Sequence, residues 1–73
     1  GWQLIDVRSE SEFNEFAIDK SKNYCLTNLQ KIKDSLYKDD NLLLICKTGG
    51  RSSLAASLLL KDGFLINFNG MKL

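Results

Sequence analysis

The apolar run LLLIC, residues 42–46, constrains the fold more than any other part of this sequence. A strand with one face in water alternates apolar and polar residues, whereas a strand covered on both faces needs no polar position. The run shows no alternation and therefore predicts a central strand of a parallel sheet. It ends in Cys46, and the sequence KTGGRSS that follows passes through two adjacent glycines into an expected helix.

Strand and helix patterns alternate along the rest of the chain. Strands are expected at residues 2–7, 24–26, 42–46 and 64–70, and helices within residues 9–16, 27–38 and 50–63. Alternation with short connections is typical of a parallel sheet with right-handed crossovers. The sequence thus predicts an α/β fold of three layers, with a central parallel sheet and helices on both faces.

The helix ends carry recognisable signals. Ser9 and Glu12, three residues apart, fit a capping box at the start of the first helix. Thr27 or Asn28 can cap the second helix. Gly63 stands where the third helix needs a left-handed residue at its end.

Apolar spacing predicts which side chains are buried. Phe13 and Phe16 are expected to share the buried face of the first helix, and Trp2 is expected in the core. The other two helices have apolar residues at helical spacing, namely Leu29, Ile32 and Leu36, then Leu54, Ala55, Leu58 and Leu59.

Composition narrows the class of protein. A length of 73 residues suits one small domain, and 44% hydrophobic with 26% charged residues is a globular composition. A net charge of +1 favours neither nucleic acid nor an anionic membrane as a partner. No signal peptide is recognisable, and we expect a cytoplasmic protein. Two cysteines do not make a disulfide framework.

The residues around Cys46 favour a reactive thiolate. The chain has no histidine, which excludes Cys–His catalysis and the usual zinc sites. Gly49 and Gly50 allow a tight turn whose N–H groups, with the start of the next helix, attract negative charge. Lys47 and Arg51 add positive charge, and such surroundings lower a cysteine pKa from ~8.5 to roughly 3.5–7.5. The alternative is a structural buried thiol.

The segments CKTGGRSS and LIDVRSESEF resemble the two signatures of rhodanese-like domains. The first is similar to the family's active-site loop, Cys-x4-Arg with internal glycine. The second is similar to its Asp-Val-Arg segment and following Glu-x-x-Tyr/Phe helix, and FNGMKL resembles its final Asn-Leu-x-Gly-Gly stretch. FAIDKSKNYCL lacks the histidine and prolines of the family's Gly-His-Ile-Pro-Gly-Ala pattern, which predicts altered loop geometry. Residues 1–73 are expected to be one such domain, trimmed at both ends or a segment of a longer protein.

The resemblance implies a sulfurtransferase without metal or organic cofactor. Cys46 would take the outer sulfur of a small anionic donor such as thiosulfate and pass it, as a persulfide, to cyanide, a thiol or a protein. Arg51 and Lys47 would hold the donor, and backbone N–H groups of the loop would stabilise the persulfide. The implied binding residues are Lys47, Thr48, Gly49, Gly50, Arg51 and Ser52. A phosphatase or arsenate reductase of this fold is disfavoured, because its loop has one more residue.

Several alternatives stay open. The chain could instead be a non-catalytic rhodanese-like module that binds a partner or senses redox state or sulfide. Asp6 and Arg8 could tune the site or form a structural hydrogen-bonded network behind the loop. Cys25 is either a small apolar filler or a resolving thiol for Cys46. A missing first strand would leave a sheet edge through which the domain could associate.

Overall fold

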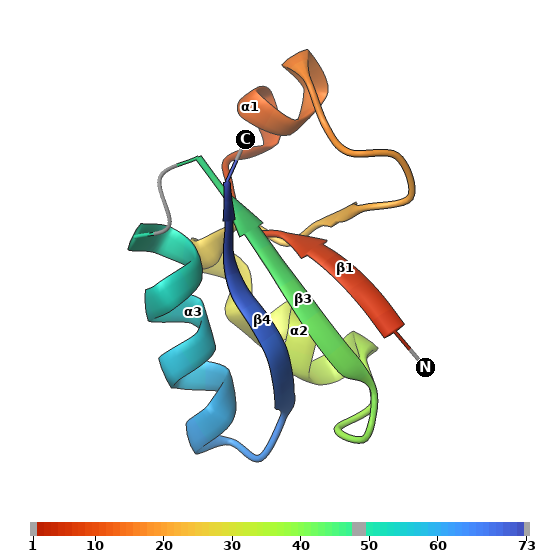
Figure 1. The fold of residues 1–73 in the computed structure, drawn as a ribbon, viewed down its shortest axis with the longest axis vertical. Helices are drawn as coiled ribbons and strands as arrows, with labels where there is room; N and C mark the ends of the chain where they lie inside the picture. The colour runs from red at the N-terminus through yellow and green to blue at the C-terminus, as the bar shows by residue number, and fades with distance from the viewer. Residues whose placement is uncertain (1, 48–49, 73) are drawn as a thin grey trace.

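The computed structural model describes residues 2–47 and 50–72. Within these residues, four strands form one parallel sheet in the order β2-β1-β3-β4 (Figure 1). The strands are β1 (Trp2–Asp6), β2 (Lys22–Asn23), β3 (Asn41–Cys46) and β4 (Leu65–Lys72). The helices are α1 (Glu10–Glu15), the 3-10 helix η1 (Leu26–Asn28), α2 (Leu29–Ser35) and α3 (Gly50–Lys61). The predicted α/β class with a central parallel sheet is confirmed, while within the described residues α2 and α3 pack on the same face of the sheet rather than on opposite faces.

The run LLLIC lies in β3, between β1 and β4, as its lack of polar positions predicts. Alternate residues of a strand face opposite sides of the sheet. Leu42, Leu44 and Cys46 belong to the core cluster, while Ile45 points to the other face and is also fully buried. The carboxyl end of β3 is therefore covered on both faces.

The core lies on one face of the sheet, where α2 and α3 pack. In Figure 1, α2 lies behind the sheet, α3 runs alongside β4, and α1 stands beyond the carboxyl ends of the strands. Burial of one large aliphatic side chain contributes roughly 1.5–3 kcal/mol to stability. The cluster comprises Ile5, Val7, Ile32, Leu42, Leu44, Cys46, Ala55, Ala56, Leu59 and Phe64.

The face of α3 that meets the sheet is narrower than predicted. Ala55, Ala56 and Leu59 are buried, in agreement with the prediction for Ala55 and Leu59. Leu54 and Leu58 are 52% and 41% exposed, so their predicted burial is wrong. These two leucines have the same spacing as Ala55 and Leu59 but lie one residue earlier, which turns them away from the sheet.

Two aromatic residues predicted to be buried are exposed. Trp2 is 62% exposed because it begins β1 on the face opposite Ile5 and the helices. Phe16 is 64% exposed because it is the C-cap of α1, with an extended backbone, and so leaves the helical face that Phe13 occupies. No helix within residues 2–47 and 50–72 combines the length and apolar character that a membrane crossing requires.

The predicted helix-end signals are largely confirmed. Ser9 Oγ accepts a hydrogen bond from Glu12 N over 3.3 Å, and Ser9 N donates to Glu12 Oε1 over 3.1 Å, which completes the capping box. Gly63 has a φ of +91° and ends α3 in the left-handed region. Asn28 stands at the N-cap of α2 but makes no capping hydrogen bond through its side chain. α2 is shorter than predicted because the backbone of Leu36 is extended.

The second strand lies earlier than the predicted residues 24–26. β2 ends before Tyr24, although Tyr24 N still donates to Asp6 O over 2.9 Å and Leu26 N donates to Val7 O over 3.1 Å. Leu26 then begins η1, so the chain continues beside β1 without forming a regular strand.

Candidate active site

Cys46 is the last residue of β3 and its side chain meets the start of α3. It lies in the core cluster and has no exposed surface. Its thiol donates a hydrogen bond over 3.3 Å to Oγ of Ser52, a buried residue in the first turn of α3. The first turn of a helix carries unpaired N–H groups and a partial positive charge. The fold can therefore stabilise negative charge at this sulfur.

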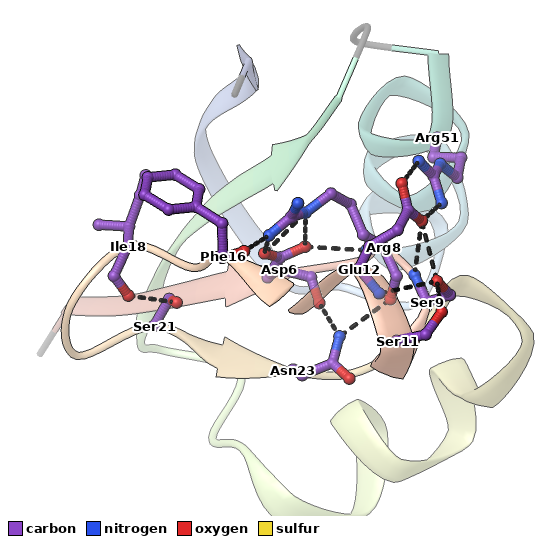
Figure 2. Close-up of polar contacts among 10 residues, drawn as sticks. All are labelled: Asp6, Arg8, Ser9, Ser11, Glu12, Phe16, Ile18, Ser21, Asn23 and Arg51. Atoms are coloured by element: carbon purple, nitrogen blue, oxygen red, sulfur yellow. Dashed lines mark hydrogen bonds and ion pairs between the residues drawn. The ribbon is translucent and has the colours of Figure 1, made fainter. Parts of the chain in front are cut away.

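Arg51, the neighbour of Ser52 in α3, is held by Glu12 of α1 (Figure 2). Nη1 donates to Oε1 over 2.6 Å and Nη2 donates to Oε2 over 2.9 Å. The hydrogen bonds to Glu12 raise the pKa of Arg51. Arg51 in turn holds the pKa of Glu12 well below its usual value, with a further contribution from Ser9. The ion pair joins α1 to α3 beside the cysteine.

Asp6 and Arg8 form a buried ion pair at the carboxyl end of β1 (Figure 2). Arg8 Nη2 donates to Asp6 Oδ2 over 2.7 Å and to Phe16 O over 2.6 Å, while Arg8 N donates to Asp6 Oδ1 over 2.9 Å. The hydrogen bond to Asp6 raises the pKa of Arg8. Asn23 Nδ2 donates to both backbone carbonyls, of Asp6 over 3.1 Å and of Arg8 over 2.9 Å. These contacts tie α1 and β2 to β1.

A pocket of ≈ 280 Å³ opens beside the end of β3. Lys47, which directly follows Cys46, contributes to its lining and is exposed. The other lining residues come from the end of β1 and from α1 with its C-cap, namely Arg8, Glu12, Glu15 and Phe16. The pocket thus lies between Arg8 of the Asp6–Arg8 pair and Lys47.

The structure places some of the predicted binding residues and not others. Ser52 contacts the thiol, Lys47 lines the pocket, and Gly50 is the first residue of α3. Thr48 and Gly49 lie outside the described residues. Among the residues that the structure describes, no group of three or more histidine, cysteine or acidic side chains is arranged to hold a metal ion.

Three residues at the site were missed from sequence. Glu12 was assigned only to the cap of α1, because its ion-pair partner Arg51 is 39 positions away. Glu15 and Phe16 line the pocket, although Phe16 was predicted to be in the core. The Glu-x-x-Phe segment around Glu12 was the available signal, since it stood in one of the two signatures.

Cys25 is a free, half-buried thiol at the start of η1. Its Sγ lies 3.4 Å from Thr27 Oγ1, and this contact lowers the pKa of Cys25. The charge of Arg51 lowers it further, and that of Glu12 opposes the change.

Comparison with known proteins gives consistent matches. The family model described as "Rhodanese-like domain" matches residues 1–71. "Uncharacterized protein YqhL" of Bacillus subtilis is 38% identical over 61 residues, which cover 84% of this chain and 48% of YqhL. A Schizosaccharomyces pombe protein named "Putative thiosulfate sulfurtransferase, mitochondrial" is 31% identical over 74 residues, covering 84% of this chain and 52% of that protein. The chain spans about half the length of these curated relatives.

Solved structures share the fold. The crystal structure of reduced Bacillus anthracis CoADR-RHD matches with a TM-score of 0.86 and 28% identity, over 99% of this chain and 13% of that chain. A rhodanese-related protein of Thermoplasma volcanium matches with a TM-score of 0.82 and 28% identity, over 94% of this chain and 71% of that chain. The same arrangement of sheet and helices thus occurs in chains of very different length.

Proposed function

The chain belongs to the family of rhodanese-like domains, and from this premise we propose that it transfers sulfane sulfur through a persulfide on Cys46. One observation carries the proposal. Cys46 ends the central parallel strand, and its thiol contacts Ser52 in the first turn of α3, beside Arg51 in the chain. Ligands of open parallel sheets bind beyond the carboxyl ends of the strands. The S. pombe relative is named as a putative thiosulfate sulfurtransferase, and thiosulfate is a small anionic sulfur donor.

In the first half-reaction, Cys46 takes up a sulfur atom and becomes a persulfide. The Cys46 thiolate attacks the outer sulfur of thiosulfate, a bond forms between Sγ and that sulfur, and the donor's S–S bond breaks. Sulfite leaves with the electron pair of the broken bond. Once the thiol is ionised, the hydroxyl of Ser52 can donate to sulfur over the same 3.3 Å contact, and the N–H groups at the start of α3 stabilise the negative charge.

In the second half-reaction, the Cys46 persulfide gives its outer sulfur to an acceptor. An acceptor such as cyanide, a thiol or a protein thiol attacks the outer sulfur, and the electron pair of the S–S bond returns to Cys46 Sγ. Lys47, exposed beside the cysteine, attracts the anionic donor in the first step. The donor competes with Glu12 for the guanidinium of Arg51, because that group already makes two hydrogen bonds to the carboxylate.

A second function, a non-catalytic module that binds a partner, is favoured by the burial of Cys46. A thiol without exposed surface is protected from reagents in solvent. Under this alternative, Cys46→Ser would leave partner binding intact. Under the proposed transfer, the same substitution abolishes activity.

Intact-protein mass spectrometry after incubation with thiosulfate, without reductant, tests the proposal. Wild type and Cys25→Ser should both gain one sulfur atom, which cyanide or dithiothreitol removes, and Cys46→Ser should gain none. A folded wild-type protein that gains no sulfur from any sulfane donor would contradict sulfur transfer and support the binding module. Circular dichroism of each sample establishes that it is folded.

A further inference from the structure

Arg8 and Arg51 are each paired with a carboxylate, but only one of the two pairs is open to solvent. Arg8 is paired with Asp6, and Arg51 is paired with Glu12 (Figure 2). The side chains of the first pair are 7% and 0% exposed, whereas those of the second are 35% and 29% exposed. An anion from solvent can therefore meet the Arg51–Glu12 pair, while the Arg8–Asp6 pair is shielded from it.

Glu12 holds the guanidinium of Arg51 at a defined position. Arg51 Nη1 donates to Oε1 over 2.6 Å and Nη2 donates to Oε2 over 2.9 Å. Such paired hydrogen bonds fix the orientation of a guanidinium as well as neutralising it. The carboxylate is itself fixed, because its Oε1 also accepts from Ser9 N over 3.1 Å and from Ser9 Oγ over 3.0 Å.

Arg51 is next to the residue that contacts the sulfur. It precedes Ser52, whose Oγ accepts a hydrogen bond from the thiol of Cys46 over 3.3 Å. Lys47 follows Cys46 and has an exposed side chain, which within residues 2–47 and 50–72 makes no hydrogen bond or ion pair with another residue. Of these two cations, Lys47 keeps its full charge, and that of Arg51 is compensated by Glu12.

This compensation affects donors of different charge unequally. A dianion gains twice the Coulomb energy that a monoanion gains from the same positive charge at the same distance. Resting on the proposed sulfur transfer, we propose that Glu12 is a specificity-determining residue. It shifts the preference of the site from the dianion thiosulfate toward sulfane donors with one negative charge. Because it acts through Arg51, Glu12 is a positioning residue.

Two donors of different charge test the assignment. Thiosulfate carries two negative charges, and methanethiosulfonate carries one. With either donor, a bond forms between Cys46 Sγ and the outer sulfur, the donor's S–S bond breaks, and sulfite or methanesulfinate leaves with its electron pair. Intact-protein mass spectrometry measures the rate at which one sulfur atom is gained, at subsaturating donor and constant ionic strength. The readout is the thiosulfate rate divided by the methanethiosulfonate rate, from which any change in the thiolate fraction of Cys46 cancels.

Glu12→Gln removes the charge and retains the cap of α1, because glutamine at this position of a capping box also accepts from the N-cap backbone. Loading by methanethiosulfonate should become about twofold faster, the effect of one partly exposed charge. Loading by thiosulfate should become about fourfold faster, since the Coulomb energy doubles with the donor's charge. The ratio therefore rises, and the rise should shrink in about 1 M salt, where the screening length is roughly 3 Å.

Two control variants separate the charge of Glu12 from other properties of α1. Glu10→Gln makes the same change at an exposed carboxylate in the same helical turn and should leave the ratio unchanged. Ser9→Ala removes the capping hydroxyl but keeps the charge of Glu12, and it should also leave the ratio unchanged. Arg51→Gln gives an independent measurement, because it leaves Glu12 uncompensated and should lower the ratio below that of wild type.

The outcomes distinguish this assignment from the proposed function. If folded wild type gains no sulfur from either donor, the proposed transfer fails and the role of Glu12 fails with it. If wild type gains sulfur but Glu12→Gln changes both rates by the same factor, only the role of Glu12 is overturned. The same holds if either control raises the ratio as much as Glu12→Gln, or if Arg51→Gln leaves it at the wild-type value.

Discussion

Arg8→Met removes the guanidinium from the buried pair at the end of β1 and keeps an unbranched apolar stem. Asp6 is 0% exposed, and after the change its carboxylate retains the backbone N–H of Arg8 as its hydrogen-bond donor among the contacts described. The carbonyl of Phe16 also loses its donor. The variant therefore leaves a charge in the protein interior without its counter-charge.

The expected cost is large for a domain of this size. Removing one partner of a buried ion pair destabilises a protein by about 3–5 kcal/mol. Total stability is roughly 0.05–0.15 kcal/mol per residue, which gives about 4–11 kcal/mol for 73 residues. Replacing both partners, in Asp6→Asn with Arg8→Met, leaves no buried charge and should be more stable than Arg8→Met alone by about 2 kcal/mol.

Urea unfolding followed by far-ultraviolet circular dichroism measures these differences. With a slope near 1 kcal/mol per molar urea for a small domain, Arg8→Met should lower the midpoint by about 3 M or unfold the protein outright. Lys33→Met, which removes the half-exposed ion pair with Asp62, is the control and should shift the midpoint far less. A loss below about 1 kcal/mol in Arg8→Met, or a double variant no more stable than the single one, would refute the reasoning.

Three further predictions follow from burial and charge. Leu59→Ala should lower the free energy of unfolding by about 2–5 kcal/mol, as measured by urea unfolding. Leu58→Ala should lower it much less, because Leu59 is buried and Leu58 is 41% exposed. Equal losses of stability would contradict the described orientation of α3. The pKa of Glu12 is lowered on folding, so its carboxylate stabilises the fold above an unfolded pKa of about 4.3, and this stabilisation is lost as the pH falls through the folded value. Urea titrations should therefore show a weaker decline in acid for Glu12→Gln than for wild type, and parallel curves would argue against the ion pair. Thr27→Val should raise the pKa of Cys25 and slow its alkylation by iodoacetamide near neutral pH, as counted by peptide mass spectrometry; an unchanged rate would mean that the hydroxyl does not act on the thiol.

The sequence was most informative where a local pattern has one structural solution. The unbroken run that forms β3 requires cover on both faces, and Ser9 with Glu12 requires a helix start. Leu54 and Leu58 show the limit, because any two residues four apart share a helix face and only the position of the sheet selects which face is buried. The capping box could be predicted because Ser9 and Glu12 are three residues apart. The ion pair of Glu12 could not, because Arg51 is 39 residues away in the sequence.

Tertiary contacts explain the remaining differences. Trp2 has a large apolar side chain of the kind that is usually buried. Its position in β1, however, turns it to the face of the sheet that α2 and α3 do not cover. The displaced β2 depends on how Tyr24 and Leu26 continue beside β1, which no local pattern specifies. The roles proposed for Cys46 and Arg51 likewise depend on where separate elements meet.

Glu12 makes the first helix and the cysteine loop parts of one equilibrium. A single carboxylate accepts from the cap of α1 at Ser9 and from the guanidinium of Arg51. The donor proposed above competes with Glu12 for the guanidinium of Arg51, so donor binding and the Glu12–Arg51 ion pair oppose each other. By thermodynamic reciprocity, anything that stabilises α1 with Glu12 in its present position must weaken anion binding by the same factor. α1, which supplies Glu12 and Glu15 to the pocket, is thus expected to modulate the affinity of the proposed site for its donor.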